Sequence, residues 1–293
     1  MKASLLAIET EHTVEDVYQE FLDNWKVKKP QRIVFINPPQ VPENVFDAEV
    51  ARRKGYYIYP PVSFLYLSSV AHRINPKLEL CIIDLNYELL KQACEGEINY
   101  DFWKQRISDE LQKHPDTLVG LTCMFGTSKS VFLQISQFIH SHFPTLLLLT
   151  GGVQATYDYQ DLLTNDFCDM VFRKEAEKQF ECFLKNIFEE DYTMMPGGSA
   201  FVYQGKIYEL PELTGLVSPD LDIRPFYHML EIEEYNKYGS LGPFSRFNGE
   251  AKKFTTVLTN RGCRAACSFC TVRDFMGQSV RASSIETVID EIR

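Results

Sequence analysis

Short apolar runs alternate with amphipathic segments between residues 31 and 188. Buried strands of the kind that parallel sheets use are predicted at Arg32 to Ile36, Leu78 to Asp84, Thr117 to Thr122, Leu146 to Thr150 and Asp169 to Phe172. Helical spacing of apolar positions predicts helices at Val62 to Ile74, Phe102 to His114, Ser130 to His142, Tyr159 to Leu163 and Glu175 to Ile187. This alternation predicts an α/β domain over residues 31 to 188, with a flavodoxin-like, doubly wound parallel sheet.

The segments on either side of this domain carry weaker patterns. Residues 1 to 30 predict a helical extension that contains an acidic helix from about Val14 to Trp25. Residues 189 to 253 predict a connector, in which Ser199 to Tyr203 and Lys206 to Glu209 form a small hairpin about Gln204-Gly205. The aromatic, glycine-containing stretch from Tyr235 to Phe247 is interpreted as an ordered linker, with a cover over the mouth of a following barrel as the alternative.

Residues 254 to 293 have the order strand, loop, helix. Phe254 to Thr259 is a β-prone run, and Ser283 to Glu286 has the form of a capping box. The apolar residues that follow share one helix face: Ile285, Val288, Ile289 and Ile292. We therefore expect the first β/α unit of a barrel, with its loop at the carboxyl end of the strand where barrel active sites lie.

Composition excludes some classes of protein. The hydrophobic fraction of 45% allows a sizeable core, and the net charge of −10 gives no footprint for non-specific nucleic-acid binding. No apolar segment is long enough to span a bilayer, and the N-terminus soon turns acidic rather than forming a signal peptide. These features predict a cytoplasmic protein with neither membrane nor nucleic-acid partners.

Three cysteines share one short loop, at Cys263, Cys267 and Cys270. Soft thiolates suit iron–sulfur clusters, and the CxxxCxxC spacing supplies three ligands of a four-iron cluster, leaving one iron open. The alternative is a zinc knuckle, but a closed zinc site takes four ligands and no Cys or His follows Cys270. Cys81 and Cys123 fall in strand patterns and are interpreted as inert small hydrophobes.

Candidate ligand contacts follow the predicted strands, because open α/β sheets bind ligands beyond the carboxyl ends of their strands. Gly151 and Gly152 permit close backbone approach, and the hydroxyls of Thr127 and Ser128 are placed to donate from a helix N-terminus. The remaining ends carry Asn37-Pro-Pro39 and Arg173 to Glu177.

The cysteine motif resembles the signature of the radical S-adenosylmethionine (SAM) enzymes. The upstream half resembles the cobalamin (B12)-binding domain that precedes the radical SAM core in one such family, through Asn37-Pro-Pro39, Pro60-Pro61, Tyr66-Leu67, Gly151-Gly152, and Arg173 with Glu175 and Glu177. The resemblance implies that Cys263, Cys267 and Cys270 hold a 4Fe-4S cluster and that Phe269 packs near the adenine of SAM. It also implies cobalamin contacts at Thr127, Ser128, Gly151, Gly152 and Glu175.

The implied function is generation of a 5′-deoxyadenosyl radical from SAM, with cobalamin-dependent methyl transfer or related carbon-centred chemistry on a small-molecule substrate. An electron donor such as flavodoxin or ferredoxin is implied as a partner. Two alternatives stay open. One is a non-catalytic cobalamin- or ligand-binding module. The other is a tRNA-modifying radical SAM enzyme, in which Cys81, Cys123 and Cys168 would hold a second cluster.

The chain also departs from the family pattern. Residues Arg173 to Glu177 lack both glycines of the family's Arg-Gly-Glu-Gly-Glu, and no histidine follows the Asp-x-His pattern that would offer a cobalt ligand. The Gly-Gly-Glu stretch that holds the SAM amino group is not found. Because a barrel needs about 200 residues or more, and the sequence ends soon after Cys270, we expect a truncated barrel that does not turn over alone.

Overall fold

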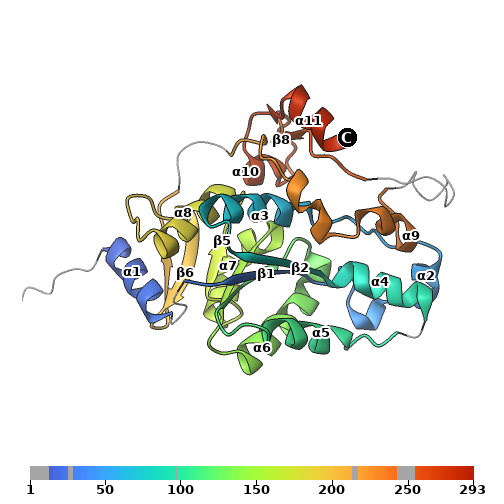
Figure 1. Ribbon diagram of the computed structural model, residues 1–293, viewed down its shortest axis with the longest axis horizontal. Coiled ribbons are helices and arrows are strands. Elements are labelled where there is room, and N and C mark those ends of the chain that lie inside the picture. Colours follow the sequence, from blue (N-terminus) through green and yellow to red (C-terminus); the bar gives the residue numbers. More distant parts are fainter. Residues whose placement is uncertain (1–12, 26–28, 97, 213–216, 243–254) are drawn as a thin grey trace, which may run out of the picture.

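The computed structural model describes residues 13–25, 29–96, 98–212, 217–242 and 255–293. Its centre is a seven-stranded sheet in the order β2-β1-β3-β4-β5-β6-β7 (Figure 1). The strands are β1 (Arg32–Asn37), β2 (Glu79–Asp84), β3 (Thr117–Thr122), β4 (Leu147–Gly151), β5 (Met170–Phe172), β6 (Ser199–Tyr203) and β7 (Lys206–Glu209). Strands β1 to β5 pair in parallel, in the order that a flavodoxin-like sheet requires. The predicted α/β fold is confirmed in these strands.

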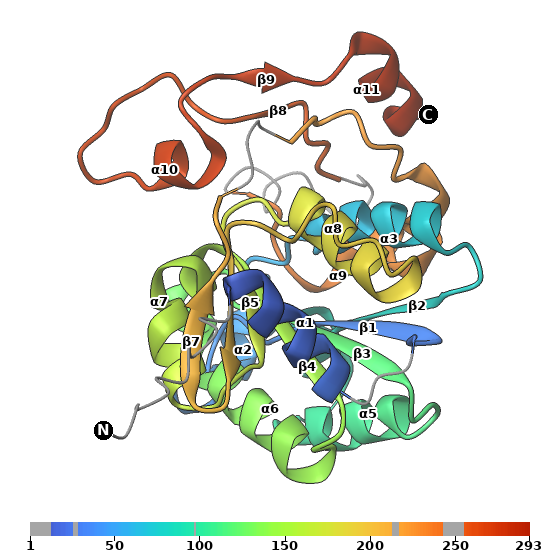
Figure 2. The ribbon, with the colours of Figure 1, turned by 90° about the vertical axis from the view of Figure 1, so that its left-hand side faces the viewer.

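Helices cover both faces of this sheet (Figures 1 and 2). On one face lie α1 (Val14–Asn24), α3 (Val62–Ile74) and α8 (Glu177–Phe188), whose apolar side chains join Ile33 and Phe35 in one core. On the other face lie α5 (Phe102–Leu111), α6 (Lys129–His142) and α7 (Val153–Thr164), which enclose Val34 and Ile36. Alternate residues of β1 thus enter two different cores, which explains why the strand is apolar throughout.

Two helices differ from the sequence-based expectation. Helix α4 (Leu85–Glu95) was not predicted, although Asp84 caps it by accepting from the amides of Asn86 and Tyr87. Helix α7 begins at Val153 rather than near Tyr159, because Gly152 makes the turn directly after β4. In both cases the helix starts at once at the carboxyl end of a strand. The shorter helix α2 (Ala48–Arg52) lies beside α4.

The segment after α8 was expected to be a connector outside the domain. Its hairpin has the predicted bounds, but β6 pairs antiparallel with β5, so the hairpin extends the main sheet. Further along, short turns η3 (Arg224–Met229) and η4 (Ile232–Glu234) lead into α9 (Tyr235–Tyr238). Tyr235 and Tyr238 are buried against α4, which agrees with an ordered linker; residues 243 to 247 of that prediction lie outside the described residues.

The C-terminal segment differs most from expectation. Phe254 lies outside the described residues, and 255 to 259 form no strand, so the predicted barrel strand is wrong for those residues. Instead, β8 (Asn260–Arg261) and β9 (Arg281–Ala282) form a two-residue antiparallel ladder. Residues 256 to 258 pack over the main domain rather than beside a parallel neighbour. The domain boundaries predicted from the sequence stay a prediction.

Two helices complete this segment, α10 (Val272–Met276) and α11 (Ile285–Ile292). The predicted helix at 285 is confirmed, but its cap is Ser284, which accepts from the amide of Thr287, and not Ser283. Ile285, Ile289 and Ile292 on its apolar face are exposed. In both ribbon views the segment lies beyond the layer formed by α3 and α8 (Figures 1 and 2). Within the described ranges, no helix is both long enough and apolar enough to span a bilayer.

Candidate functional site

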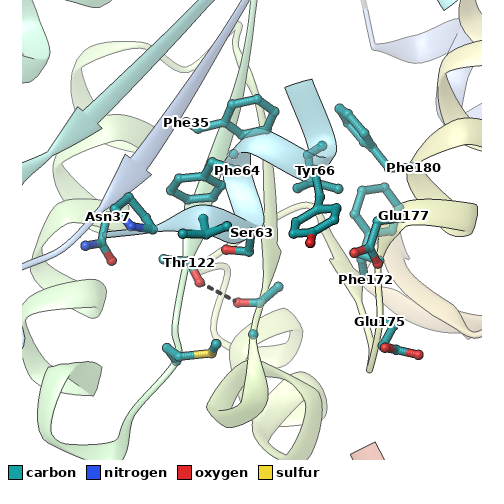
Figure 3. A pocket seen from close by; sticks show the side chains of 18 of the residues that line it. Phe35, Asn37, Ser63, Phe64, Tyr66, Thr122, Phe172, Glu175, Glu177 and Phe180 are labelled. Carbon is teal, nitrogen blue, oxygen red and sulfur yellow. Dashed lines mark hydrogen bonds between the residues drawn. The ribbon is translucent and has the colours of Figure 1, made fainter. Parts of the chain in front are cut away.

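A cavity of about 400 Å³ lies at the carboxyl ends of β1, β3, β4 and β5. Figure 3 shows its aromatic wall, formed by Phe35, Phe64, Tyr66, Phe172 and Phe180. Polar atoms enter from Asn37, Thr122, Glu175 and Glu177. The volume falls within the roughly 300–1,000 Å³ that is usual for cofactor and small-molecule pockets. The place of the cavity is the one that the doubly wound topology predicts.

Glycines shape the floor of this cavity. Gly152 has a φ of +107°, and a Cβ there would lie 2.7 Å from the carbonyl oxygen of Cys123. A Cβ on Gly120 would lie 2.8 Å from the ring of Phe35, so the absence of a side chain lets that ring lie against β3. The Thr122 hydroxyl donates to the Gly151 carbonyl at 3.4 Å and links the ends of β3 and β4 (Figure 3).

The structure brings only some of the predicted cobalamin contacts to the cavity. Gly151, Gly152 and Glu175 line it. Thr127 and Ser128 are not part of its lining: Thr127 is exposed, and the buried Ser128 hydroxyl donates to the Phe125 carbonyl at 2.9 Å. These two residues belong to the short turn η2 (Gly126–Ser128), whose own backbone uses the hydroxyl that the sequence offered for a ligand.

The cysteine loop runs from β8 to β9, and Arg261, Phe275 and Met276, on either side of the cysteines, line the cavity. Gly262 at its start has a φ of +82°, and a Cβ there would lie 2.0 Å from the Ser279 carbonyl oxygen, so the two ends of the loop approach closely. The Cys263 amide donates across the loop to the Gly277 carbonyl at 3.4 Å. The Ala265 amide donates to the Cys263 sulfur at 3.4 Å.

The three cysteines are accessible on this loop. Cys263 is half-buried, whereas Cys267 and Cys270 are exposed, and Phe269 is 89% exposed. Among the residues that the structure describes, no group of three or more His, Cys, Asp or Glu side chains is arranged to hold a metal ion. The donor set still suits an iron–sulfur cluster, because three thiols lie on one exposed loop and an amide donates to one of the sulfurs. The cluster ligands and the SAM contact of Phe269 stay predictions.

Three contacts dock the loop onto the main domain. Phe275 of α10 is buried and lines the cavity, while the Tyr157 hydroxyl of α7 donates to Asp274 at 2.8 Å. Burial and this carboxylate raise the pKa of Tyr157 to about 12, so the phenol stays a proton donor. Arg261, two residues before Cys263, also lines the cavity.

Arg261 is the centre of a buried ion-pair group. Its guanidinium lies 3.2 Å from a Glu175 oxygen, 2.5 Å from a Glu177 oxygen and 4.6 Å from the centre of the Tyr66 ring. Burial disfavours the charged guanidinium, but the carboxylates of Glu177 and then Glu175 outweigh it and raise the pKa of Arg261. The role of Arg261 was not predicted from the sequence, although a basic residue precedes the cysteine motif and two acidic residues follow β5.

The remaining cysteines do not resemble cluster ligands. Cys123 and Cys168 are buried, and Cys81 is half-buried in β2. Burial raises the pKa of Cys81 to about 11 and that of Cys123 to about 12, and it also raises that of Cys168. Raised values favour the thiol over the thiolate that a metal needs. Their interpretation as small hydrophobes agrees with this burial, and the alternative of a second cluster loses support.

Fold and site together define an α/β domain that has a cavity at the carboxyl edge of its sheet and is joined to a loop with three cysteines. No family model matches the chain. The curated relatives include cytidylyl-2-hydroxyethylphosphonate methyltransferase of Streptomyces wedmorensis, which is 24% identical over 91% of this chain and 52% of its own length. Another is the anaerobic magnesium-protoporphyrin IX monomethyl ester cyclase of Synechocystis, 24% identical over 50% of this chain and 27% of its own length.

Solved structures give the same picture. The radical SAM methyltransferase TsrM of Kitasatospora setae, solved with cobalamin and a [4Fe-4S] cluster bound, matches 90% of this chain and 45% of its own with a TM-score of 0.56 at 15% identity. The cobalamin-dependent SAM radical enzyme OxsB, solved with aqua-cobalamin and SAM, matches 99% of this chain and 35% of its own with a TM-score of 0.60 at 19% identity.

These comparisons confirm the resemblance that the motifs predicted. The chain is similar in sequence to curated methyltransferases and in fold to cobalamin-dependent radical SAM enzymes. It spans about half the length of the first of its curated relatives. At these identities the structural likeness shows the fold, and the activity is a matter for proposal.

Proposed function

We propose that this chain forms the cobalamin-binding domain and the cluster-binding loop of a radical SAM enzyme that transfers a methyl group, or carries out related carbon-centred chemistry, on a small molecule. The observation that carries this proposal is the position of the cavity. It opens at the carboxyl edge of the sheet, and Arg261, Phe275 and Met276, which lie on either side of the three cysteines in the sequence, line it. A ligand in the cavity would therefore contact the two ends of the cysteine loop.

The lining suits the flat, largely apolar ring of a corrin. Aromatic side chains line one side, and glycines at 151 and 152 let a ligand approach the ends of β4 closely. Lys174 adopts a φ of +62°, the left-handed conformation that glycine favours, where family members carry the first glycine of their motif. Lys174 therefore takes a backbone conformation that a glycine would adopt without strain.

Each part of the site has a separate task. Cys263, Cys267 and Cys270 would bind three irons of the cluster, and the aromatic wall would orient the corrin. When bound, the cluster and SAM supply one-electron chemistry at carbon, and cobalamin supplies a methyl carrier. The protein's own contribution would be to hold a ligand against the aromatic wall of the cavity, next to the two ends of the loop that carries the thiols. The electron donor and the small-molecule substrate belong to the same proposal.

Anaerobic reconstitution with iron and sulfide tests this assignment. We expect the wild-type chain to take up iron and to show an iron–sulfur spectrum that changes on addition of SAM, and to bind hydroxocobalamin. Replacing Cys263, Cys267 or Cys270 with Ala is expected to abolish iron uptake. The matched control is Cys81→Ala, which removes a half-buried thiol of raised pKa and is expected to leave uptake unchanged.

The outcomes separate the competing functions. Hydroxocobalamin binding without a SAM-responsive cluster would favour the non-catalytic binding module. Iron uptake that survives all three substitutions, or zinc in place of iron under anaerobic conditions, would overturn the enzymatic proposal.

A further inference from the structure

Two arginines face each other at the neck of the cysteine loop. Arg261 on β8 is the direct ladder partner of Arg281 on β9, and all three cysteines lie in the stretch between them. Like charges directly opposite in an antiparallel pair repel one another, so this ladder would be unstable without nearby opposite charges. Both side chains are nonetheless largely buried, at 6% and 13% exposure.

A carboxylate from the sheet domain lies between the two guanidiniums. One oxygen of Glu175 lies 3.2 Å from Arg261, and its other oxygen lies 2.8 Å from Arg281. Glu177 adds a second contact to Arg261 at 2.5 Å. Glu175 follows β5 and Glu177 begins α8, so these charges are fixed to the sheet domain and not to the loop.

The arginines in turn hold several parts of the loop. A guanidinium nitrogen of Arg281 donates to the Met276 carbonyl at 2.5 Å, at the end of α10, and another donates to the Val217 carbonyl. Arg261 lies over the ring of Tyr66 on α3, which is itself part of the cavity wall. Loop, cavity wall and sheet edge therefore meet at one group of charges.

We propose that Glu175 and Glu177 are positioning residues for the cysteine loop. Through Arg261 and Arg281 they hold its two ends, β8 and β9, together and fix them beside the cavity. This inference deepens the proposed function and rests on it for its consequence in catalysis. It assigns Glu175 to the loop rather than to direct contact with a bound corrin. Removing the Glu175 carboxylate leaves Arg281 with no carboxylate contact in this group and Arg261 with Glu177 alone, which is costly because both guanidiniums are buried.

Hydrogen exchange in the iron-free chain tests the closure of the neck directly. We expect Glu175→Gln to speed the exchange of the amides between 262 and 280 by about tenfold or more, with Glu177→Gln having a smaller effect. The matched control is Glu181→Gln, on the same helix, whose carboxylate pairs with Arg73 and Lys185 instead. It is expected to leave those amides unchanged. Exchange in β1 and β3 is expected to be the same in all variants.

A double variant distinguishes a specific contact between Glu175 and Arg281 from a general loss of stability. Since Glu175 and Arg281 act at one contact, Glu175→Gln combined with Arg281→Gln is expected to change the exchange much less than the sum of the two single effects. Strictly additive effects, or faster exchange spread evenly over the sheet, would overturn the proposal.

Cofactor binding then tests whether these ion pairs matter for the proposed site. We expect Glu175→Gln to reduce the iron retained after anaerobic reconstitution by about threefold or more, whereas Glu181→Gln is expected to retain as much iron as the wild type. A Kd for hydroxocobalamin raised tenfold by Glu175→Gln, with unchanged exchange in the loop, would make Glu175 a ligand contact and refute the inference. If the wild-type chain takes up no iron at all, the proposed function fails, while the exchange result still decides whether these ion pairs hold the two ends of the loop together.

Discussion

Replacing Gly152 with Ala tests the close approach of strand ends beneath the cavity. Gly152 has φ +107° and ψ 171°, a conformation that is essentially restricted to glycine and costs other residues about 1–3 kcal/mol. The new Cβ would also lie 2.7 Å from the Cys123 carbonyl oxygen and 3.0 Å from the Thr122 hydroxyl. The Cys123 carbonyl is held because it accepts from the Ala155 amide at 3.2 Å, and the Thr122 hydroxyl donates to the Gly151 carbonyl at 3.4 Å.

Strain and overlap together give an expected loss of about 3 kcal/mol in the free energy of unfolding. Urea unfolding followed by circular dichroism measures it, and the midpoint is expected to fall by about 1 M. Two other glycines serve as controls. Gly205→Ala has positive φ but open space and is expected to cost about 1 kcal/mol, while Gly96→Ala has neither feature and is expected to be nearly neutral.

The comparison among the three variants decides the argument. If Gly152→Ala is no more destabilising than Gly205→Ala, then the contact with the end of β3 contributes nothing, and our account of the cavity floor is wrong. A loss confined to hydroxocobalamin binding, without loss of stability, would contradict it equally.

Three further predictions concern the cavity, the turn after β5 and a buried histidine. Ser63→Phe, at the second residue of α3, is expected to fill the cavity and weaken hydroxocobalamin binding at least tenfold, as measured by equilibrium dialysis. Ser130→Phe, at the second residue of α6 and outside the cavity lining, is expected to leave the binding unchanged. Equal effects of the two variants would show that hydroxocobalamin does not bind in the cavity. Lys174→Gly is expected to keep the free energy of unfolding within about 0.5 kcal/mol of the wild type, because relief of the left-handed backbone offsets the greater flexibility of glycine in the unfolded chain. Lys178→Gly, in α8, is expected to cost about 1 kcal/mol. Equal costs would contradict backbone strain at Lys174. Burial lowers the pKa of His140, but Asp169 and the Asp166 carbonyl outweigh burial and raise the pKa above its usual 6.5. The stabilisation of the fold by this imidazolium is therefore complete below pH 6.5 and is lost as the pH rises through the pKa of His140 in the folded state. The difference in unfolding free energy between wild type and His140→Gln is therefore expected to shrink from pH 5.5 to pH 9, and a constant or growing difference would refute the pairing.

The sheet was predictable because its strands carry their own signal. Each of β1 to β5 is an apolar run bounded by turn residues, and burial on both faces requires this whatever the strand order. The hairpin of β6 and β7 was also visible, through Gln204-Gly205. Its membership of the main sheet was not, since pairing with β5 is a long-range contact that leaves no local pattern.

The site was predictable in position but not in detail. Glycines at 151 and 152 indicated a ligand edge, and they line the cavity. Thr127 and Ser128 do not line the cavity, and the Ser128 hydroxyl donates to the Phe125 carbonyl, because a hydroxyl near a helix N-terminus serves the backbone as readily as it serves a ligand. Their contact with a cofactor stays a prediction.

The amino-acid sequence alone determined the alternation of strands and helices, the three thiols with their spacing, and hence the family that the chain resembles. These are local features, set by side-chain periodicity and by residues close together along the chain. Tertiary structure alone decided which charges meet. Arg261, Arg281 and Glu175 come from three separate segments, and their pairing depends on how those segments pack in a medium of low dielectric. No pattern along the chain encodes that contact, because only folding removes the water that would otherwise keep the three charges apart.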